Sequence, residues 1–409
     1  MKPVLFVFGF DFVSKVLMGL AGLLLIRFLP ENEYSLFTVV MAFSTMLVQG
    51  ISSNMNGVYI AGHKRLGLEN RPQRFLVLQL WFLGVALSIV AALGAIEPRV
   101  IAILVALTVA NGLLEFTKTH YQYKQNFLAL SLAEFLRTLL FISVLFFFLL
   151  PERVPFSAGT VLFAQSLCTA MVVALWFGRK LDWKEFLKID ETIRLGKLMM
   201  KSKYRYMIGY FFAVALLLRT DIFMLDRLVS RFELATYGSA FRYFSLVLVI
   251  LTALHTVFLP KTQAAHRSSE LRKLFRKHFR IVAMVLPVVF LGGWLSEWII
   301  PWIDGGKYPG AILIFRALCF VAAISICFSP YANVLFRYEL YRFLFYLATS
   351  ACLLNVVLNL LLIPEYRGLG AAIATFVSAG AINVGMFLKS RYLLSTRPLP
   401  DNTSLLANA

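Results

Sequence analysis

The stretch FGFDFVSKVLMGLAGLLLIRFLP, residues 8–30, is long and apolar enough to form a membrane-spanning helix. It nevertheless contains one acidic and one basic residue in its N-terminal half. Asp11 and Lys15 are four residues apart, so on a helix they share one face. A charged side chain at the centre of a bilayer costs about 2.5–3.5 kcal/mol on insertion scales. We therefore expect this helix to turn its charged face toward a solvated cavity rather than toward lipid.

The whole chain has the composition of a polytopic membrane protein. Of its 409 residues 60% are hydrophobic, and its mean hydropathy of +0.77 exceeds what is typical of a soluble domain. The formal net charge of +19 comes mostly from Lys and Arg between the apolar runs, which is typical of membrane-protein loops and argues against nucleic-acid binding. The four cysteines form no CxxC pattern and the five histidines show no ligand spacing. We expect no disulfide, metal site or cofactor.

Twelve apolar runs are each long enough to cross about 30 Å of hydrocarbon as a helix. They lie at 4–29, 34–59, 75–96, 99–117, 127–150 and 157–178, and then at 204–226, 234–259, 279–301, 308–334, 342–363 and 368–388. These runs predict an all-α polytopic membrane protein with two six-helix bundles, residues 1–178 and 204–392. Between the bundles lies a basic amphipathic linker, 179–203, which fits a helix on anionic lipid headgroups, and residues 393–409 form a cytoplasmic tail.

The distribution of Lys and Arg predicts the direction of the spans. With the N-terminus inside, the cytoplasmic segments hold 28 of the 40 basic residues and the outside segments hold seven. Cytoplasmic loops carry such an excess, so both termini are expected in the cytoplasm. The outside loops are too short for the large extracytoplasmic loop that a membrane polymerase or glycosyltransferase usually needs. No P-loop, GxSxG or HExxH pattern is present, so we do not expect an enzyme.

Two short matches suggest that the second bundle is a duplicate of the first. LPENEYSLFTVV (29–40) aligns with VSRFELATYGSA (229–240), which places Glu33 opposite Glu233. PERVPFSAG (151–159) parallels PEYRGLGAA (364–372) before the last span of each half. Repeated bundles are typical of transporters, in which the substrate site lies near the middle of the membrane where the repeats meet.

Several charged residues lie deep inside the spans, the basic ones being Lys15, Arg137, Arg219, Arg242 and Arg316 and the acidic ones Asp11, Glu134 and Asp221. Five bases against three acids leave a positive excess, which an anion or water must offset. Arginine suits phosphate because its planar fork can bind two oxygens. Glu134 and Arg137 share one helix face, whereas Asp221 needs a partner on another span, for which Arg242 is the candidate. The alternative is that these charges are ion pairs that only hold helices together.

The chain resembles the O-antigen and polysaccharide flippases of the multidrug/oligosaccharidyl-lipid/polysaccharide exporter superfamily. The resemblance is strongest in RTDIFMLDRLVSRFELATYGSAFRYF (219–244), where Asp221, Glu233, Tyr237 and Ala240 match the family pattern. RFLPENEYSLF (27–37) is similar to the equivalent place in the first half, and GLGAAIAT (368–375) to the start of the last span. The glycine that often precedes the aromatic in this family is replaced by Ser35 and Ala235.

The resemblance implies a transporter of the bacterial inner membrane that moves an undecaprenyl-pyrophosphate-linked oligosaccharide to the outer leaflet by alternating access. Lys15, Arg137 and Arg316, with Arg219 and Arg242, would then meet the anionic headgroup. Asp11, Glu134 and Asp221 would couple transport to H⁺ or Na⁺, and polysaccharide polymerase and glycosyltransferases would be associated partners. A cation-coupled multidrug antiporter of the same superfamily, a membrane glycosyltransferase or polymerase, and a channel are the alternatives.

Overall fold

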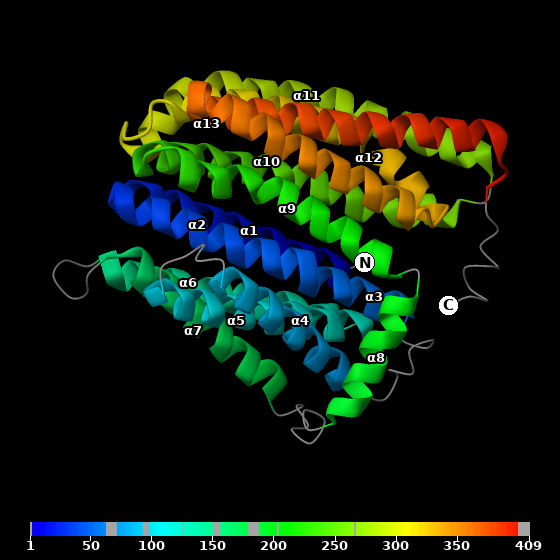
Figure 1. Ribbon diagram of the computed structural model, residues 1–409, viewed down its shortest axis with the longest axis horizontal. Coiled ribbons are helices and arrows are strands. Elements are labelled where there is room, and N and C mark those ends of the chain that lie inside the picture. The colour runs from blue at the N-terminus through cyan, green and yellow to red at the C-terminus, as the bar shows by residue number, and fades with distance from the viewer. Residues whose placement is uncertain are drawn as a thin grey trace. The chain divides into compact units, whose positions relative to one another are not determined.

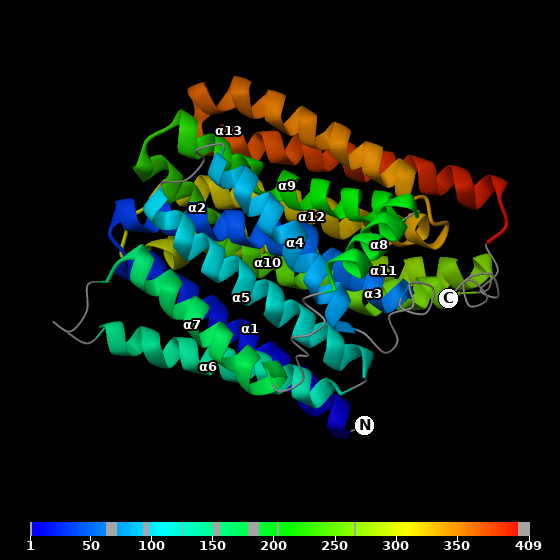
Figure 2. The same cartoon turned by 60° about the horizontal axis from the view of Figure 1, so that its bottom comes forward.

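The computed structural model describes residues 2–62, 72–92, 98–124, 126–149, 156–178, 188–202, 204–265 and 267–399. All regular elements in these ranges are helices, as the two views of Figures 1 and 2 show. The chain divides into two compact units, Met1–Ala215 and Leu216–Ala409. We call them unit 1 and unit 2, and the long helix α9 (Tyr204–Leu228) begins in the first and ends in the second.

Unit 1 contains six spans and a shorter helix. The spans are α1 (Lys2–Phe28), the continuous run of α2 (Glu31–Leu47), η1 (Val48–Ser53) and α3 (Asn54–Gly62), and then α4 (Pro72–Ala92), α5 (Pro98–Tyr123), α6 (Phe127–Leu149) and α7 (Ala158–Phe177). The shorter helix is α8 (Ile189–Lys201). Proline opens α4 and α5, where its missing N–H removes no helical hydrogen bond, and Ser157 caps α7 through its side chain.

Unit 2 contains the end of α9, then α10 (Arg231–Ala264), α11 (Ser268–Asp304), α12 (Ala311–Arg337) and α13 (Tyr341–Thr396). The last of these is two helices, because Arg367 has a left-handed φ of 52° with ψ of −129° and breaks the run. Among the described residues, ten helices satisfy the length and hydropathy of a membrane span. Adding the 27-residue α1 and counting α13 twice gives twelve, as the hydropathy predicted.

The helices run past the predicted spans at the ends expected to face the cytoplasm. α11 begins at Ser268 rather than at residue 279, and α5 continues to Tyr123 rather than ending at residue 117. Hydropathy marks only the part of a helix that lies in hydrocarbon, whereas the backbone hydrogen bonds continue into polar sequence. As a result Lys118, one residue beyond the predicted span 99–117, lies on the helix α5.

The second span contains a six-residue π-helix, η1, which its neighbour Asn54 stabilises. Asn54 donates its side-chain N–H to the carbonyls of Gln49 at 2.7 Å and Gly50 at 3.0 Å. A π-helix widens the turn and weakens the regular hydrogen-bond ladder, so a side-chain donor at its end compensates part of that loss.

Contacts within each unit support the predicted duplication. In unit 1, Oε2 of Glu33 accepts the backbone N–H of Ala158 at 2.7 Å. In unit 2, Oε1 of Glu233 pairs with Nη1 of Arg367 at 2.7 Å. In each unit, a glutamate in the first matching segment (29–40 or 229–240) therefore binds a residue in the second matching segment (151–159 or 364–372). The two sequence matches are thus in contact in the same way in both units.

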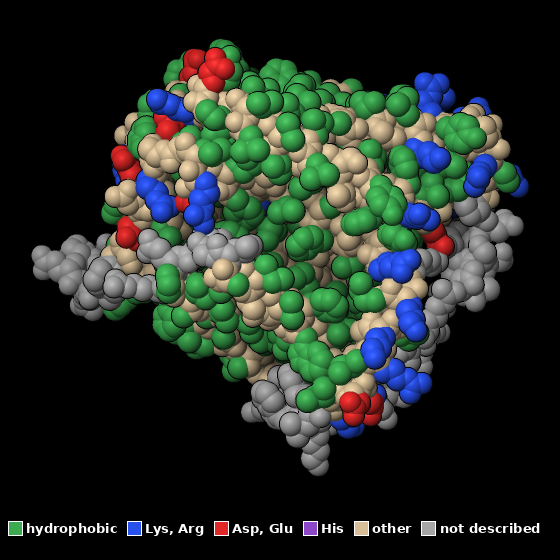
Figure 3. Space-filling view, in the orientation of Figure 1, with side chains coloured by type: hydrophobic (Ala, Val, Ile, Leu, Met, Phe, Trp, Pro, Cys, Tyr) green, Lys and Arg blue, Asp and Glu red, His purple; other side chains and the backbone are tan. Residues whose placement is uncertain are grey.

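Within the basic linker, residues 189–201 form the amphipathic helix α8. Thr192, Leu195 and Met199 are buried along one side of α8, which packs on α4, and Glu191 pairs with Arg74. In Figure 3 Lys and Arg side chains follow α8 at the lower right, while hydrophobic side chains cover much of the visible face. A helix with an apolar side and a cationic side suits the boundary between lipid headgroups and water.

Cysteine labelling tests the direction of the spans. Glu31 and Pro309 are exposed at helix ends expected outside, and Arg267 is exposed at an end expected inside. In a cysteine-free background, an impermeant maleimide added to intact cells should label Glu31→Cys and Pro309→Cys but not Arg267→Cys, because polar loops stay on the side that their charge selects. Labelling of Arg267→Cys before lysis would reverse the predicted topology.

Candidate functional site

Asp221 is the centre of a buried polar cluster in unit 2. Its side chain on α9 is only 2% exposed. One carboxylate oxygen accepts hydrogen bonds from the hydroxyls of Tyr237, at 2.5 Å, and Thr375. The other accepts amide N–H groups from Asn359 at 2.9 Å and Asn355 at 3.4 Å. The donors come from α10 and from both parts of α13, so this one acid connects four helical segments.

The helix break at Arg367 builds this cluster. The chain reverses there, so that Thr375 on the second part of α13 comes within 3.4 Å of Asn355 on the first part. Asn355 and Asn359 are one helical turn apart and share a face, and the amide of Asn359 also bonds Asn355 at 3.0 Å. The signal in the sequence is the NVVLN pattern at 355–359, whose two asparagines are one helical turn apart, and it was not among the predicted site residues.

Arg242 is not the partner of Asp221, so that prediction was wrong. All four side chains that bond the carboxylate are neutral. Four donors can satisfy both oxygens of a buried carboxylate without a counter-charge. Among the described residues, no base therefore neutralises the charge of Asp221, and none donates a hydrogen bond to the fully buried Oδ1 of Asn359 beside it.

Arg219 and Arg242 lie together on the neighbouring part of unit 2. The guanidinium carbon of Arg219 lies 4.7 Å from the ring centre of Phe241, and its charge is close enough to act on Arg242. The buried Nε of Arg219 has no hydrogen-bond partner, and no carboxylate pairs with this residue among the described parts of the chain. Two adjacent cations with an unused donor form a place where an anion would be favoured.

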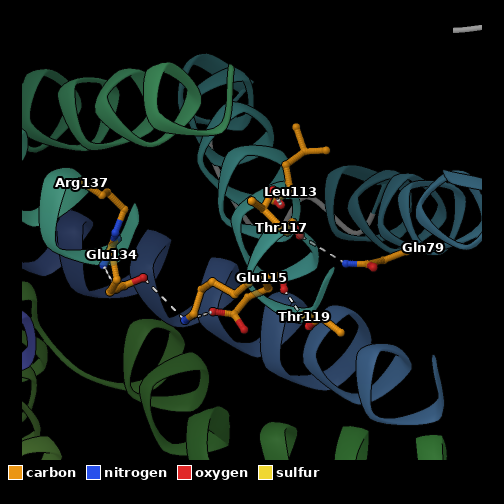
Figure 4. A network of polar contacts seen from close by, with 9 residues as sticks. Gln79, Leu113, Glu115, Thr117, Thr119, Glu134 and Arg137 are labelled. Carbon is orange, nitrogen blue, oxygen red and sulfur yellow. Dashed lines mark hydrogen bonds and ion pairs between the residues drawn. The ribbon is translucent and has the colours of Figure 1, made fainter. Parts of the chain in front are cut away.

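Unit 1 holds a network of four charges between α5 and α6 (Figure 4). Nζ of Lys118 lies 2.8 Å from Glu115 and 3.5 Å from Glu134, and Nη2 of Arg137 lies 2.5 Å from Glu134. Glu134 and Arg137 share one helix face, as predicted, and form an ion pair on it, whereas Lys118 and Glu115 were not expected beside them. Two bases and two acids balance, so the network accounts for the charge of Arg137 without an added anion.

Arg316 is also held by its own unit. Its Nη2 pairs with Glu297 at 2.8 Å, and its Nε donates to the carbonyl of Gly293 at 3.0 Å. These contacts join α12 to α11 near the exposed Trp294 and Trp298. Arg316 and Arg137 each form an ion pair, which favours a role in holding helices together. Their contact with a lipid headgroup stays a prediction.

Of Asp11 and Lys15 on α1, the structure describes only the side chain of Lys15. Lys15 is exposed on α1, beside the buried Ser14, and Phe10 packs edge-on against Phe135 of α6 at 5.0 Å. The side chain of Asp11 lies outside the described residues. The pairing of Asp11 with Lys15, and their coupling to transport, therefore stay predictions.

Comparison with known proteins identifies the fold. No family model and no curated protein sequence matches the chain. Among solved structures it is similar to the lipid II flippase MurJ in an inward closed conformation, with a TM-score of 0.71, 12% identity and coverage of 98% of this chain and 95% of that one. An inward-facing multidrug resistance MATE transporter gives 0.59 at 15% identity, covering 93% and 94%.

A third match is a transporter of the MOP superfamily from Pyrococcus furiosus, with a TM-score of 0.59, 16% identity and coverage of 96% and 94%. The chain thus has the fold of the transporters of this superfamily, the multidrug/oligosaccharidyl-lipid/polysaccharide exporters, over nearly its whole length. At these identities the likeness concerns the fold. The fold that the sequence motifs indicated is confirmed.

Proposed function

We propose that this protein is a flippase that moves an undecaprenyl-pyrophosphate-linked oligosaccharide from the inner to the outer leaflet by alternating access. The likeness to the lipid II flippase supports a lipid-linked substrate, since its TM-score of 0.71 exceeds the 0.59 of the multidrug transporter. On this proposal the protein works in a bacterial cytoplasmic membrane. Glycosyltransferases supply its substrate and a polysaccharide polymerase consumes its product.

The observation that carries the proposal is the pair of arginines in unit 2. Arg219 has an unused donor and no carboxylate partner among the described residues, and the charge of Arg242 repels it. A pyrophosphate offers several oxygens to two guanidinium groups and removes that repulsion. Of the five bases predicted to bind the headgroup, these two become the principal candidates. Arg137, Arg316 and Lys15 follow as the secondary ones.

Asp221 is the principal candidate for ion coupling. A buried carboxylate without a counter-charge gains from binding H⁺ or Na⁺, because either neutralises it. The oxygens of Thr375, Tyr237 and Asn359 beside it suit a small cation, and the Oδ1 of Asn359 has no donor to satisfy it. Glu134 is less suited to this role because two bases already engage it, and Asp11 stays a candidate.

A cation-coupled multidrug antiporter is the second candidate, because multidrug MATE transporters share the fold. Its substrates are cations, which two adjacent arginines would repel. The two functions therefore predict opposite effects of removing these charges. Loss of Arg219 and Arg242 should weaken transport of a pyrophosphate lipid and leave or improve transport of a cationic dye.

Transport in proteoliposomes distinguishes the two functions. The double variant Arg219→Gln, Arg242→Gln is expected to move a polyprenyl-pyrophosphate oligosaccharide at least about tenfold more slowly, since each charge-assisted bond contributes roughly 1.5–3 kcal/mol. Exposure of the sugar to an impermeant lectin measures the rate. Arg267→Gln, an exposed residue before α11, is the matched control. Unchanged lipid transport together with efflux of ethidium would favour the antiporter.

A further inference from the structure

Four aromatic side chains form a continuous cluster where α11, α12 and α13 pack together in unit 2. The ring centre of Tyr331 on α12 lies 5.3 Å from that of Phe275 on α11 and 4.9 Å from that of Phe387 on the second part of α13. Phe328 on α12 completes the cluster, at 6.0 Å from Tyr331 and 5.6 Å from Phe387. All four side chains are half-buried, so each ring keeps part of its surface accessible. We call these four rings the aromatic floor.

An arginine lies one helical turn beyond the aromatic floor on each of the two outer helices. Arg272 precedes Phe275 by three residues, and Arg391 follows Phe387 by four, so each shares a helix face with its phenylalanine. The ring contacts join the start of α11 to the end of α13, so both arginines lie beyond the aromatic floor at the same end of unit 2. Both are exposed, and the guanidinium carbon of Arg391 lies 5.5 Å from the ring centre of Phe387.

These two arginines are not neutralised by acids. Neither Arg272 nor Arg391 forms an ion pair with any described residue. The acid in the first turn of α11, Glu270, lies where its charge acts on Arg337 of α12. Further Lys and Arg side chains gather near the C-terminal end of α13 (Figures 1 and 3). The surface beside the aromatic floor therefore has an excess of positive charge, which attracts an anion.

The aromatic floor lies where the apolar runs end. Phe275 comes four residues before the run 279–301, and Phe387 lies next to the last residue of the run 368–388. Aromatic side chains gather at the level where lipid headgroups meet hydrocarbon, and long basic side chains reach from there to the phosphates. The distribution of Lys and Arg predicts that this end of unit 2 faces the cytoplasm, and the cytoplasmic leaflet is the one rich in anionic lipids.

We propose that unit 2 binds an anionic phospholipid at this place, with its phosphate on Arg272 and Arg391 and its glycerol and first acyl carbons on the aromatic floor. Each guanidinium can offer two N–H groups to phosphate oxygens. A zwitterionic lipid has the same chains, but its ammonium group offsets the phosphate charge and is repelled by the arginines. The site does not depend on which molecule the protein transports.

Native mass spectrometry of the full chain in detergent tests the site. With dioleoyl phosphatidylglycerol and dioleoyl phosphatidylcholine added at equal concentration, the wild type is expected to retain one phosphatidylglycerol in preference to phosphatidylcholine. In the double variant Arg272→Gln, Arg391→Gln the dissociation constant for phosphatidylglycerol should rise at least about tenfold, because two charge-assisted bonds are lost.

The double variant Lys273→Gln, Lys277→Gln is the matched control. It also removes two exposed charges from this part of the chain, but each lies two residues from Phe275 and therefore points to the opposite side of α11. This control should bind phosphatidylglycerol as the wild type does. Phe387→Leu keeps both arginines and removes one ring of the aromatic floor, so it should weaken binding as well.

Three results would overturn the site. A wild type that retains both lipids equally would do so whatever the variants show, and would leave this basic surface to an acidic protein instead. Equal losses in the two double variants would show a diffuse attraction by the whole basic surface. Unchanged binding by Phe387→Leu would show that the lipid does not lie on the aromatic floor.

Discussion

Replacement of Asp221 by alanine is expected to lower the free energy of unfolding by about 3–5 kcal/mol, the cost of breaking a buried charged cluster. The carboxylate accepts from Tyr237, Asn359, Asn355 and Thr375, so its removal leaves four buried donors without an acceptor. Each such donor costs about 1–3 kcal/mol, less what the amides recover by bonding one another. Denaturant unfolding of the purified protein in detergent, with unit 2 followed by its tryptophans, measures the loss.

Asp221→Asn separates structure from coupling. The amide has the shape of the carboxylate and keeps one acceptor oxygen, so this variant is expected to fold and to lose clearly less stability than alanine. It cannot bind a proton, and it offers Na⁺ no charge. If Asp221 couples transport, the asparagine variant should be present in the membrane at normal level but no longer respond to an ion gradient. If Asp221→Ala is as stable as the wild type, Asp221 does not hold the cluster together. If Asp221→Asn keeps full gradient-driven transport, Asp221 does not couple transport to an ion.

Removal of Lys118 is expected to have the second large effect. In unit 1 this base lies between Glu115 and Glu134, so Lys118→Met leaves two acids facing each other with only Arg137 to offset them. Breaking a buried ion pair from one side typically costs about 3–5 kcal/mol, and a side chain about a quarter exposed should fall at the lower end. The amount of protein in the membrane and its unfolding midpoint measure the effect.

A double variant decides whether the network is the cause. Lys118→Met combined with Glu134→Gln removes one charge of each sign, so it should recover part of the stability that Lys118→Met loses. Lys124→Met, at an exposed position after the end of α5, is the matched control and should change stability by less than about 0.5 kcal/mol. Equal losses in the single and the double variant would show that Lys118 acts by packing and not by its charge.

The spans were predictable because they follow from properties that act along the chain. Each needs about 20 apolar residues, and the bilayer supplies the environment that makes such a run a helix whatever its neighbours are. The predicted run 204–226 corresponds to α9 (Tyr204–Leu228), and 127–150 to α6 (Phe127–Leu149). The amphipathic α8 was predictable for the same reason, since its pattern depends only on local spacing.

The charged residues were predictable only where their partners are near in sequence. Glu134 and Arg137 are three residues apart, and they share the predicted helix face and pair on it. Lys118 reaches the same acid from another helix, at a position just beyond the predicted span 99–117. Arg316 finds Glu297 across the turn between α11 and α12. Counting acids and bases predicted an excess of positive charge, but it did not show which bases were already engaged.

Asp221 shows where sequence reasoning ends. Its charge and depth marked it as important, yet the donors that bind it lie between 16 and 154 residues away along the chain. They meet it because Arg367 reverses α13 and brings Asn359 and Thr375 to one place. Hydropathy and charge are properties of segments, so they determine which segments cross the membrane. Hydrogen bonds require contact within about 3 Å, so only the packing of the helices decides which side chains share a site.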